Sequence, residues 1–275
     1  MLVRLGHSPD PDDAFMFWAL AEGRVDMGEF EFELVHADIQ TLNGWALDAR
    51  LEVTAISLGT YPLVQDSYVL LPHGASIGSG YGPVLVAREP LALDDLRDVE
   101  IVVPGRMTTG FLVLRLMLGH EFSYRELPFD RIIDEVKGGG ADAGLVIHEG
   151  QLTNASEGLT KVADLGEWWL LETGLPLPLG VNVARRDLGD ALPALSNVLM
   201  ESIRAGLAAR REALEYAMLF GRGLDAALAD RFVGMYVNDY TCDFGDEGRA
   251  AVRELLRRGQ EVGLFEGPAD VDFAP

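Results

Sequence analysis

Residues 175–180 read Leu-Pro-Leu-Pro-Leu-Gly and lead directly into Val181-Asn-Val-Ala184, a short apolar run typical of a buried strand. Prolines at alternate positions interrupt regular structure, so this stretch predicts a boundary between two parts of the fold. A second boundary is predicted at the glycine-rich turn Gly78-Ser-Gly-Tyr-Gly82, which also precedes a strand. This turn does not lead from a strand into a helix, so a flexible hinge is favoured over a nucleotide site.

Strand-like and helix-like stretches alternate along the chain, which favours α/β architecture. Residues 85–179 contain their own strand–helix–strand–helix series, so we expect a small lobe there, inserted into a large lobe formed by residues 1–84 and 180–275. Two lobes joined by two chain crossings leave a central cleft, where small ligands commonly bind. The carboxyl ends of the strands should face that cleft.

Hydropathy periodicity predicts the individual elements. Alternation or a short apolar run predicts a strand, and apolar residues three and four apart predict a helix. Strands are expected at residues 2–6, 30–35, 53–57, 68–71, 83–88, 100–103, 143–147 and 181–184. Helices are expected at residues 12–21, 41–49, 109–118, 129–136, 192–220 and 246–258.

Charge and cysteine content exclude several classes of function. The chain of 275 residues has 44 acidic and 22 basic residues, a formal charge of −22. Such a chain repels phosphate backbones and anionic lipid, so we expect neither a nucleic acid nor a membrane as partner. The single cysteine, Cys242, excludes an internal disulfide and a Cys-rich zinc site, and the spacing of the five histidines matches no zinc motif. We therefore expect no metal.

The N-terminal sequence indicates a location. It reaches a proline and an acid by residue 10 and has no apolar core of the kind found in secretory signals. No stretch approaches the length needed to span a bilayer. We therefore expect a soluble cytoplasmic protein, whose oligomeric state the sequence does not indicate.

A candidate anion site lies in the loop Pro104-Gly-Arg-Met-Thr-Thr109, between a predicted strand and a predicted helix. Free backbone N–H groups at a helix start, together with the hydroxyls of Thr108 and Thr109, would form a local trap for a carboxylate. The alternative is that Thr108 only caps the helix. Ser57, at the end of an earlier strand, is either a second donor across the cleft or a turn-forming serine.

His148 is the candidate general base. It follows the buried strand Ala143-Gly-Leu-Val-Ile147 and precedes Glu149, a position at which clefts open. Histidine titrates near neutral pH, which suits proton transfer. The alternative is a hydrogen-bonded structural histidine. No serine or cysteine is evidently paired with it, so the sequence does not indicate a nucleophilic triad.

Two further groups have competing interpretations. The acids in Ser8-Pro-Asp-Pro-Asp-Asp13 could bind Mg²⁺, but we favour Asp12 and Asp13 as caps of the following helix that offset its dipole. Trp168 and Trp169 could face an aromatic ligand, but core residues are the default interpretation.

Several motifs occur in a fixed order over nearly the whole chain. They are Ser8-Pro9 with Asp13, Thr41-Leu-Asn43, Val103-Pro-Gly-Arg106 with Thr108-Thr109, Ile147-His-Glu149, Asp164-Leu-Gly166, Thr173-Gly-Leu-Pro-Leu-Pro-Leu-Gly180, Arg185-Arg-Asp-Leu-Gly189 and Tyr236-Val-Asn238. In these motifs the sequence resembles the 1,4-dihydroxy-6-naphthoate synthase family of the futalosine route to menaquinone. The His-Glu and Thr-Gly-Leu-Pro-Leu-Pro-Leu-Gly segments are the most specific.

The resemblance implies a two-lobed fold like that of type II periplasmic binding proteins, used here by a cytosolic enzyme. It implies a cofactor-free carbon–carbon lyase that converts cyclic dehypoxanthine futalosine, a small aromatic carboxylate carrying a sugar, to 1,4-dihydroxy-6-naphthoate. By the same resemblance His148 is the base, and the ligand is bound by Ala55, Ile56, Ser57, Thr108 and Thr109.

Two alternatives stay open: a non-catalytic binding protein for a small carboxylate, and the chorismate dehydratase of the same pathway. The chain also departs from the pattern that it resembles. Family members often read Ser-Pro-Cys-Pro-Asn-Asp where this chain has Asp10 and Asp12, and a tyrosine often follows the His-Glu segment where it has Asn154.

Overall fold

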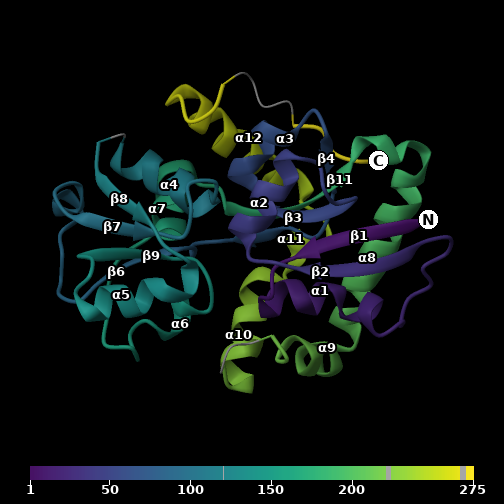
Figure 1. Ribbon diagram of the computed structural model, residues 1–275, viewed down its shortest axis with the longest axis horizontal. Coiled ribbons are helices and arrows are strands. Elements are labelled where there is room, and N and C mark those ends of the chain that lie inside the picture. Colours follow the sequence, from purple (N-terminus) through teal and green to yellow (C-terminus); the bar gives the residue numbers. More distant parts are fainter. Residues whose placement is uncertain (120, 221–223, 267–270) are drawn as a thin grey trace.

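Two β-sheets lie side by side in the computed structural model, each covered by helices (Figure 1). The structure describes residues 1–119, 121–220, 224–266 and 271–275; His120, one of the five histidines counted above, lies outside them. The α/β class and the two-lobed arrangement predicted from the sequence are confirmed. The exact lobe limits stay predictions.

The larger sheet has the strand order β2-β1-β3-β11-β4, with β5 paired to β11. Its strands are β1 (Leu2–His7), β2 (Glu31–His36), β3 (Val53–Ser57), β4 (Tyr68–Leu70), β5 (Ser76–Gly78) and β11 (Leu177–Arg185). β1 runs parallel to β2 and β3, whereas β11 runs antiparallel to β3, β4 and β5. All five residues of β3 are buried, as expected for a strand covered on both faces.

The smaller sheet has the order β10-β6-β9-β7-β8. Its strands are β6 (Val84–Ala87), β7 (Glu100–Val103), β8 (Ser123–Glu126), β9 (Ala143–Val146) and β10 (Thr160–Asp164). Helices α4 (Thr109–Leu118) and α7 (Leu165–Thr173) lie on one face, and α5 (Ile132–Gly138) and α6 (Gly150–Thr153) on the other (Figure 1). Successive side chains of a strand point to opposite faces of the sheet. In β9, Leu145 therefore packs in the apolar cluster around α4, and Val146 packs in the cluster around α5.

The larger lobe also contains most of the helices. They are α1 (Pro11–Ala21), α2 (Ile39–Leu47), α3 (Tyr61–Val64), α8 (Leu192–Ala208), α9 (Arg210–Ala217), α10 (Ala226–Tyr236), α11 (Asp239–Cys242) and α12 (Gly245–Glu261). α1 packs on α8 and α9, and every residue from Pro11 to Leu20 is buried. A helix that is apolar on nearly all sides has to be buried. It carries the acids of its first turn into the interior.

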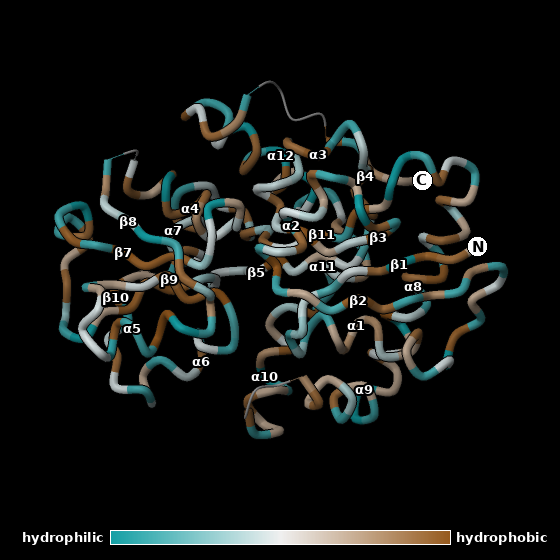
Figure 2. Tube along the Cα trace, viewed as in Figure 1, coloured by the Kyte–Doolittle hydropathy of each residue, from teal (hydrophilic) through white to brown (hydrophobic). Residues whose placement is uncertain are grey.

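Figure 2 shows apolar segments along strands of both lobes and hydrophilic segments in many of the outer turns. Within the described residues, no helix has both the length and the apolar character that a bilayer crossing requires.

The strand predicted at residues 181–184 begins earlier than predicted. β11 begins at Leu177, so the proline-rich stretch is largely a strand and not a loop. Pro178 lies opposite Ile77 of β5, and the register of this pairing shifts between Pro178 and Gly180. Proline lacks the N–H that a regular ladder needs, and such an irregularity is where a strand tolerates it.

The single helix predicted at residues 192–220 was wrong. Two helices occur, α8 and α9, separated at Ala209, whose backbone is not helical (φ −112°, ψ 46°). The break turns α9 onto α1, a packing preference that no local pattern records.

Several elements were missed: β5, β8, β10, α7 and α10. β8 and β10 are the two edge strands of the smaller sheet. Their sequences, Ser-Tyr-Arg-Glu and Thr-Lys-Val-Ala-Asp, are rich in polar residues because an edge is partly exposed to water.

Candidate active site

A cavity of about 110 Å³ lies in the cleft and is lined by both lobes. The larger lobe contributes the β1–α1 loop, β3, β5, β11 and α10, and the smaller lobe contributes the start of α4 and the segment after β9. All six residues that the sequence predicted for the site line this cavity: Ala55, Ile56, Ser57, Thr108, Thr109 and His148. The structure therefore brings them together, and their roles remain predictions.

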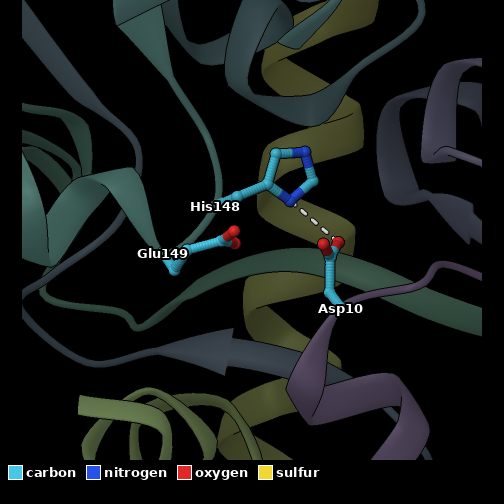
Figure 3. Close-up of side chains that lie close together, drawn as sticks. All are labelled: Asp10, His148 and Glu149. Atoms are coloured by element: carbon cyan, nitrogen blue, oxygen red, sulfur yellow. Dashed lines mark ion pairs between the residues drawn. The ribbon is translucent and has the colours of Figure 1, made fainter. Parts of the chain in front are cut away.

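His148 follows β9 and is held from two sides. Its Nδ1 atom lies 2.8 Å from Oδ2 of Asp10, and its ring centroid lies 4.1 Å from that of Phe129. The Nε2 atom is buried and has no hydrogen-bond partner within the described residues. Figure 3 shows the ring with one nitrogen directed at Asp10 and the other directed away from it. An imidazole nitrogen in this state can accept a proton from a bound molecule.

Asp10 is the N-cap residue of α1, yet its side chain makes no hydrogen bond to that helix. Its Oδ2 atom instead accepts a hydrogen bond from the Ser8 hydroxyl at 2.8 Å and pairs with His148. The predicted capping role of Asp12 and Asp13 was wrong, because both lie inside the first turn. The N-cap position is Asp10, two residues before Asp12, and Asp10 lines the cavity.

Asp12 and Asp13 form a buried acidic end of the cavity. Asp12 accepts a hydrogen bond from the Ser76 hydroxyl at 3.2 Å, and Asp13 accepts one from the backbone N–H of Ser8 at 2.8 Å. Burial, reinforced by the charges of Asp13 and Asp10, raises the pKa of Asp12 well above its usual range. Burial also raises the pKa of Asp13 to about 6, against the lowering effect of the Ser8 hydrogen bond.

One group of possible metal ligands occurs in the described part of the chain. Asp10, His148 and Glu149 each offer an atom within 4.8 Å of the others (Figure 3). Of the three acids that the magnesium alternative invoked, Asp10 is part of this group, and Asp12 and Asp13 are not. The short contact between Asp10 and Nδ1 of His148 already engages two of the three ligands with each other.

The twin threonines are engaged within the protein. Thr108 accepts from the Phe111 N–H at 3.2 Å and donates to the Gly105 carbonyl at 2.8 Å, so the capping interpretation is confirmed. Thr109 donates to the Leu179 carbonyl at 2.6 Å and accepts from the Gly59 N–H at 3.1 Å.

The groups at this end that remain for a ligand are therefore backbone amides. Thr109 and Gly110 occupy the first turn of α4 and line the cavity. First-turn N–H groups have no acceptor within their own helix, and the helix dipole gives them a partial positive charge. This end suits an anion through the backbone rather than through the threonine hydroxyls.

Ser57 is held by Asn43, which is fully buried. The Asn43 amide nitrogen donates to the Ser57 hydroxyl at 3.0 Å, and its oxygen accepts from the Ser57 N–H at 2.8 Å. The serine oxygen is thus an acceptor toward the protein, and its own hydrogen can point to the cavity. Asn43 occurs in a quoted motif, but sequence reasoning assigned it no role.

Sequence reasoning also missed a polar contact between the lobes. The Tyr236 hydroxyl of α10 donates to the Gln151 side chain of α6 at 2.6 Å, and both residues line the cavity. Burial raises the pKa of Tyr236 well above its usual range. The motif Tyr236-Val-Asn238, quoted in the sequence analysis without a role, could have pointed to Tyr236 as a site residue. Trp169 is fully buried and donates to the Pro176 carbonyl at 3.0 Å, so its interpretation as a core residue is confirmed.

Two lobes with a cavity in the cleft between them define a protein with a periplasmic-binding-protein-like fold. Solved binding proteins share this fold at low identity. The ligand-binding component of an ABC-type import system from Staphylococcus aureus aligns with a TM-score of 0.73, 14% identity, and coverage of 100% of this chain and 96% of its own. The alkanesulfonate-binding protein from Xanthomonas axonopodis pv. citri aligns with a TM-score of 0.66 and 11% identity. This alignment covers 86% of this chain and 84% of its own.

Closer relatives identify the family. Residues 3–261 match a family described as menaquinone biosynthesis. A 1,4-dihydroxy-6-naphthoate synthase of Thermus thermophilus is 44% identical over 95% of both chains, and one of Streptomyces coelicolor is 40% identical over 98% of both. A solved structure from Archaeoglobus fulgidus is 47% identical, with a TM-score of 0.92 over 96% of this chain and 98% of its own. The chain belongs to this menaquinone biosynthesis family.

Proposed function

We propose that this protein is a 1,4-dihydroxy-6-naphthoate synthase, a carbon–carbon lyase that acts on cyclic dehypoxanthine futalosine with His148 as general base. The activity is the one named for the Thermus and Streptomyces relatives. The observation that carries the residue assignment is the Nε2 atom of His148, which is buried and without a hydrogen-bond partner in the described chain, on a ring that lines the cavity. Its lone pair is available for a substrate proton.

The two ends of the cavity favour one orientation of such a substrate. The first-turn amides of Thr109 and Gly110, with the Ser57 hydroxyl, suit a carboxylate. Asp12 and Asp13 also line the cavity, and beside them a carboxylate would meet a carboxyl group. We therefore place the carboxylate at α4 and the sugar hydroxyls toward the acids, which accept hydrogen bonds.

In the proposed step, Nε2 of His148 takes the proton of a substrate hydroxyl. The electron pair of that O–H bond forms a carbonyl while the neighbouring carbon–carbon bond breaks. The pair from the broken bond remains on the ring system, which becomes the aromatic naphthoate. The step is neither an oxidation nor a reduction overall, so we expect no cofactor. Exclusion of water by the closed lobes would strengthen the electrostatic contacts.

The test is incubation of purified protein with cyclic dehypoxanthine futalosine, with and without EDTA, followed by naphthoate absorbance and mass spectrometry. We expect product at equal rates in both samples. General-base help is worth about 10²–10⁴-fold, so His148→Ala should lose at least ~10² in kcat while it still binds the substrate.

His36→Ala is the matched control, because His36 is exposed on β2 and does not line the cavity. It should keep the wild-type rate. Normal turnover by His148→Ala would remove the base from this proposal.

The second candidate is a binding protein without chemistry, which the low-identity neighbours favour. It predicts that the substrate is recovered unchanged and that His148→Ala alters affinity only. Product formed from chorismate instead of the futalosine compound would indicate the dehydratase alternative.

A further inference from the structure

We propose that Asp10 is the positioning residue of the site: it fixes the tautomer and orientation of His148 from the opposite lobe. The inference rests on the proposed role of His148 as base. Asp10 belongs to the β1–α1 loop of the larger lobe, whereas His148 follows β9 of the smaller lobe. Figure 3 shows the two side chains approaching from these separate segments.

The geometry determines which ring nitrogen carries the proton. A carboxylate has no hydrogen to donate, so the 2.8 Å contact requires a hydrogen on Nδ1 of His148. In the neutral ring Nε2 then has a free lone pair, and this is the buried atom for which the described residues offer no hydrogen-bond partner. When Nε2 takes a proton, the resulting imidazolium lies against the Asp10 carboxylate, which stabilises it.

The carboxylate is itself held in place. The Ser8 hydroxyl donates to the same oxygen, Oδ2, at 2.8 Å. Asp10 is 5% exposed, and it stands between Pro9 and Pro11, whose rings restrict the loop backbone. Aspartate at a helix N-cap usually bonds to the helix backbone, but this one makes no such bond. The side chain is thus oriented toward the ring and not toward its own helix.

A purely structural role of Asp10, in which it only holds the lobes together, would have different kinetic consequences. Other hydrogen bonds also join the lobes, from Tyr236 to Gln151 and from Thr109 to the Leu179 carbonyl. Loss of the Asp10 carboxylate should therefore leave the lobes joined. A positioning role predicts that kcat falls while KM changes little, whereas a structural role predicts a rise in KM.

The experiment uses full-length Asp10→Asn protein, with Asp48→Asn as control, because Asp48 forms an exposed ion pair with Arg50. We expect kcat of Asp10→Asn to fall about 100-fold, with KM within about threefold. The control should keep the wild-type kcat. Nitrogen NMR of ¹⁵N-histidine-labelled protein should show the hydrogen of His148 on Nδ1 in the wild type, and partly or wholly on Nε2 in Asp10→Asn.

Two further variants extend the test, and the first keeps the proposal falsifiable if Asp10→Asn folds poorly. Ser8→Ala leaves the carboxylate present but less restrained, and should reduce kcat several-fold. In the His148→Ala background, Asp10→Asn should cost no further activity, because the two residues act as a unit. A strong additional loss would mean that Asp10 acts independently of the ring.

Wild-type kcat in Asp10→Asn, or an unchanged tautomer in that variant, would overturn the positioning role while leaving the base in place. Full activity of His148→Ala would instead overturn the proposed base. The NMR result would then still report whether Asp10 sets the state of the ring.

Discussion

The carboxyl groups of Asp12 and Asp13 illustrate how burial changes the chemistry of a residue. Burial raises the pKa of both. The neutral form of Asp12 has one donor and one acceptor, as an amide does. Family members often have asparagine at this position, so the departure noted in the sequence changes the hydrogen-bonding chemistry less than the formal charge suggests.

Asp13 makes stability depend on pH. The pKa of Asp13 rises from 3.8 to about 6 on folding, so the folded state holds this proton more tightly than the unfolded chain does. The free energy of unfolding should therefore fall as pH rises from about 4 through 6. At about 1.4 kcal/mol per pKa unit the loss is roughly 3 kcal/mol at most. Asp13→Asn keeps an acceptor for the Ser8 N–H and should remove the part of this slope that Asp13 contributes, while the part from Asp12 remains, measured by urea unfolding at pH 4, 6 and 8. An equally steep slope in the variant would contradict the assignment, and exposed Asp48→Asn should leave the slope unchanged.

At the scale of the element, the start of α4 combines a structural and a ligand-facing role. The Thr108 hydroxyl caps the helix, and the following amides line the cavity. The capping interpretation of Thr108 is therefore confirmed, and the binding of an anion by the backbone N–H groups stays a prediction.

Thr108→Ala removes the cap and should lower the free energy of unfolding by about 1 kcal/mol. It should also raise KM, because the first turn, where we place the substrate carboxylate, loses its restraint. Thr108→Ser retains a capping hydroxyl and should behave nearly as the wild type in both thermal unfolding and kinetics. Equal losses in the serine and alanine variants would show that the methyl group matters, and not the cap.

At the scale of the whole molecule, the lobes share one continuous apolar cluster as well as hydrogen bonds. Ile56 and Tyr61 of the larger lobe pack in the same cluster as Leu85 and Phe111 of the smaller lobe. Thr109 adds a polar connection at the cleft, since its hydroxyl bonds to Gly59 and to Leu179. The cavity depends on this relative placement.

Thr109→Val keeps the side-chain shape but leaves the Leu179 carbonyl and the Gly59 N–H without the hydroxyl, a cost of about 1–3 kcal/mol for buried groups. We expect a higher KM with a smaller change in kcat, and a larger radius of gyration by small-angle X-ray scattering without ligand. Thr41→Val is the control, because the Thr41 hydroxyl donates to Asp38 of the same lobe. An unchanged KM in Thr109→Val would show that this hydroxyl is not needed to hold the lobes in their relative placement.

Much of the fold could be predicted from local sequence. The helix at residues 109–118 and the strand at residues 53–57 have the predicted bounds, because periodicity and capping act over a few residues. His148 was found for the same reason, since a buried run ends just before it. The edge strands were missed because exposure to water removes the apolar pattern.

The sequence by itself determined the α/β class, the two crossings and the candidate base, since each of these leaves a pattern among neighbouring residues. Only the tertiary structure decided the partner of that base. Asp10 had the sequence context of a helix cap, and its pairing with His148 depends on how two sheets pack. Likewise, the Thr109 hydroxyl looked free for a ligand until packing supplied it with the Leu179 carbonyl as acceptor. Contacts between distant segments follow from packing, which local periodicity does not encode.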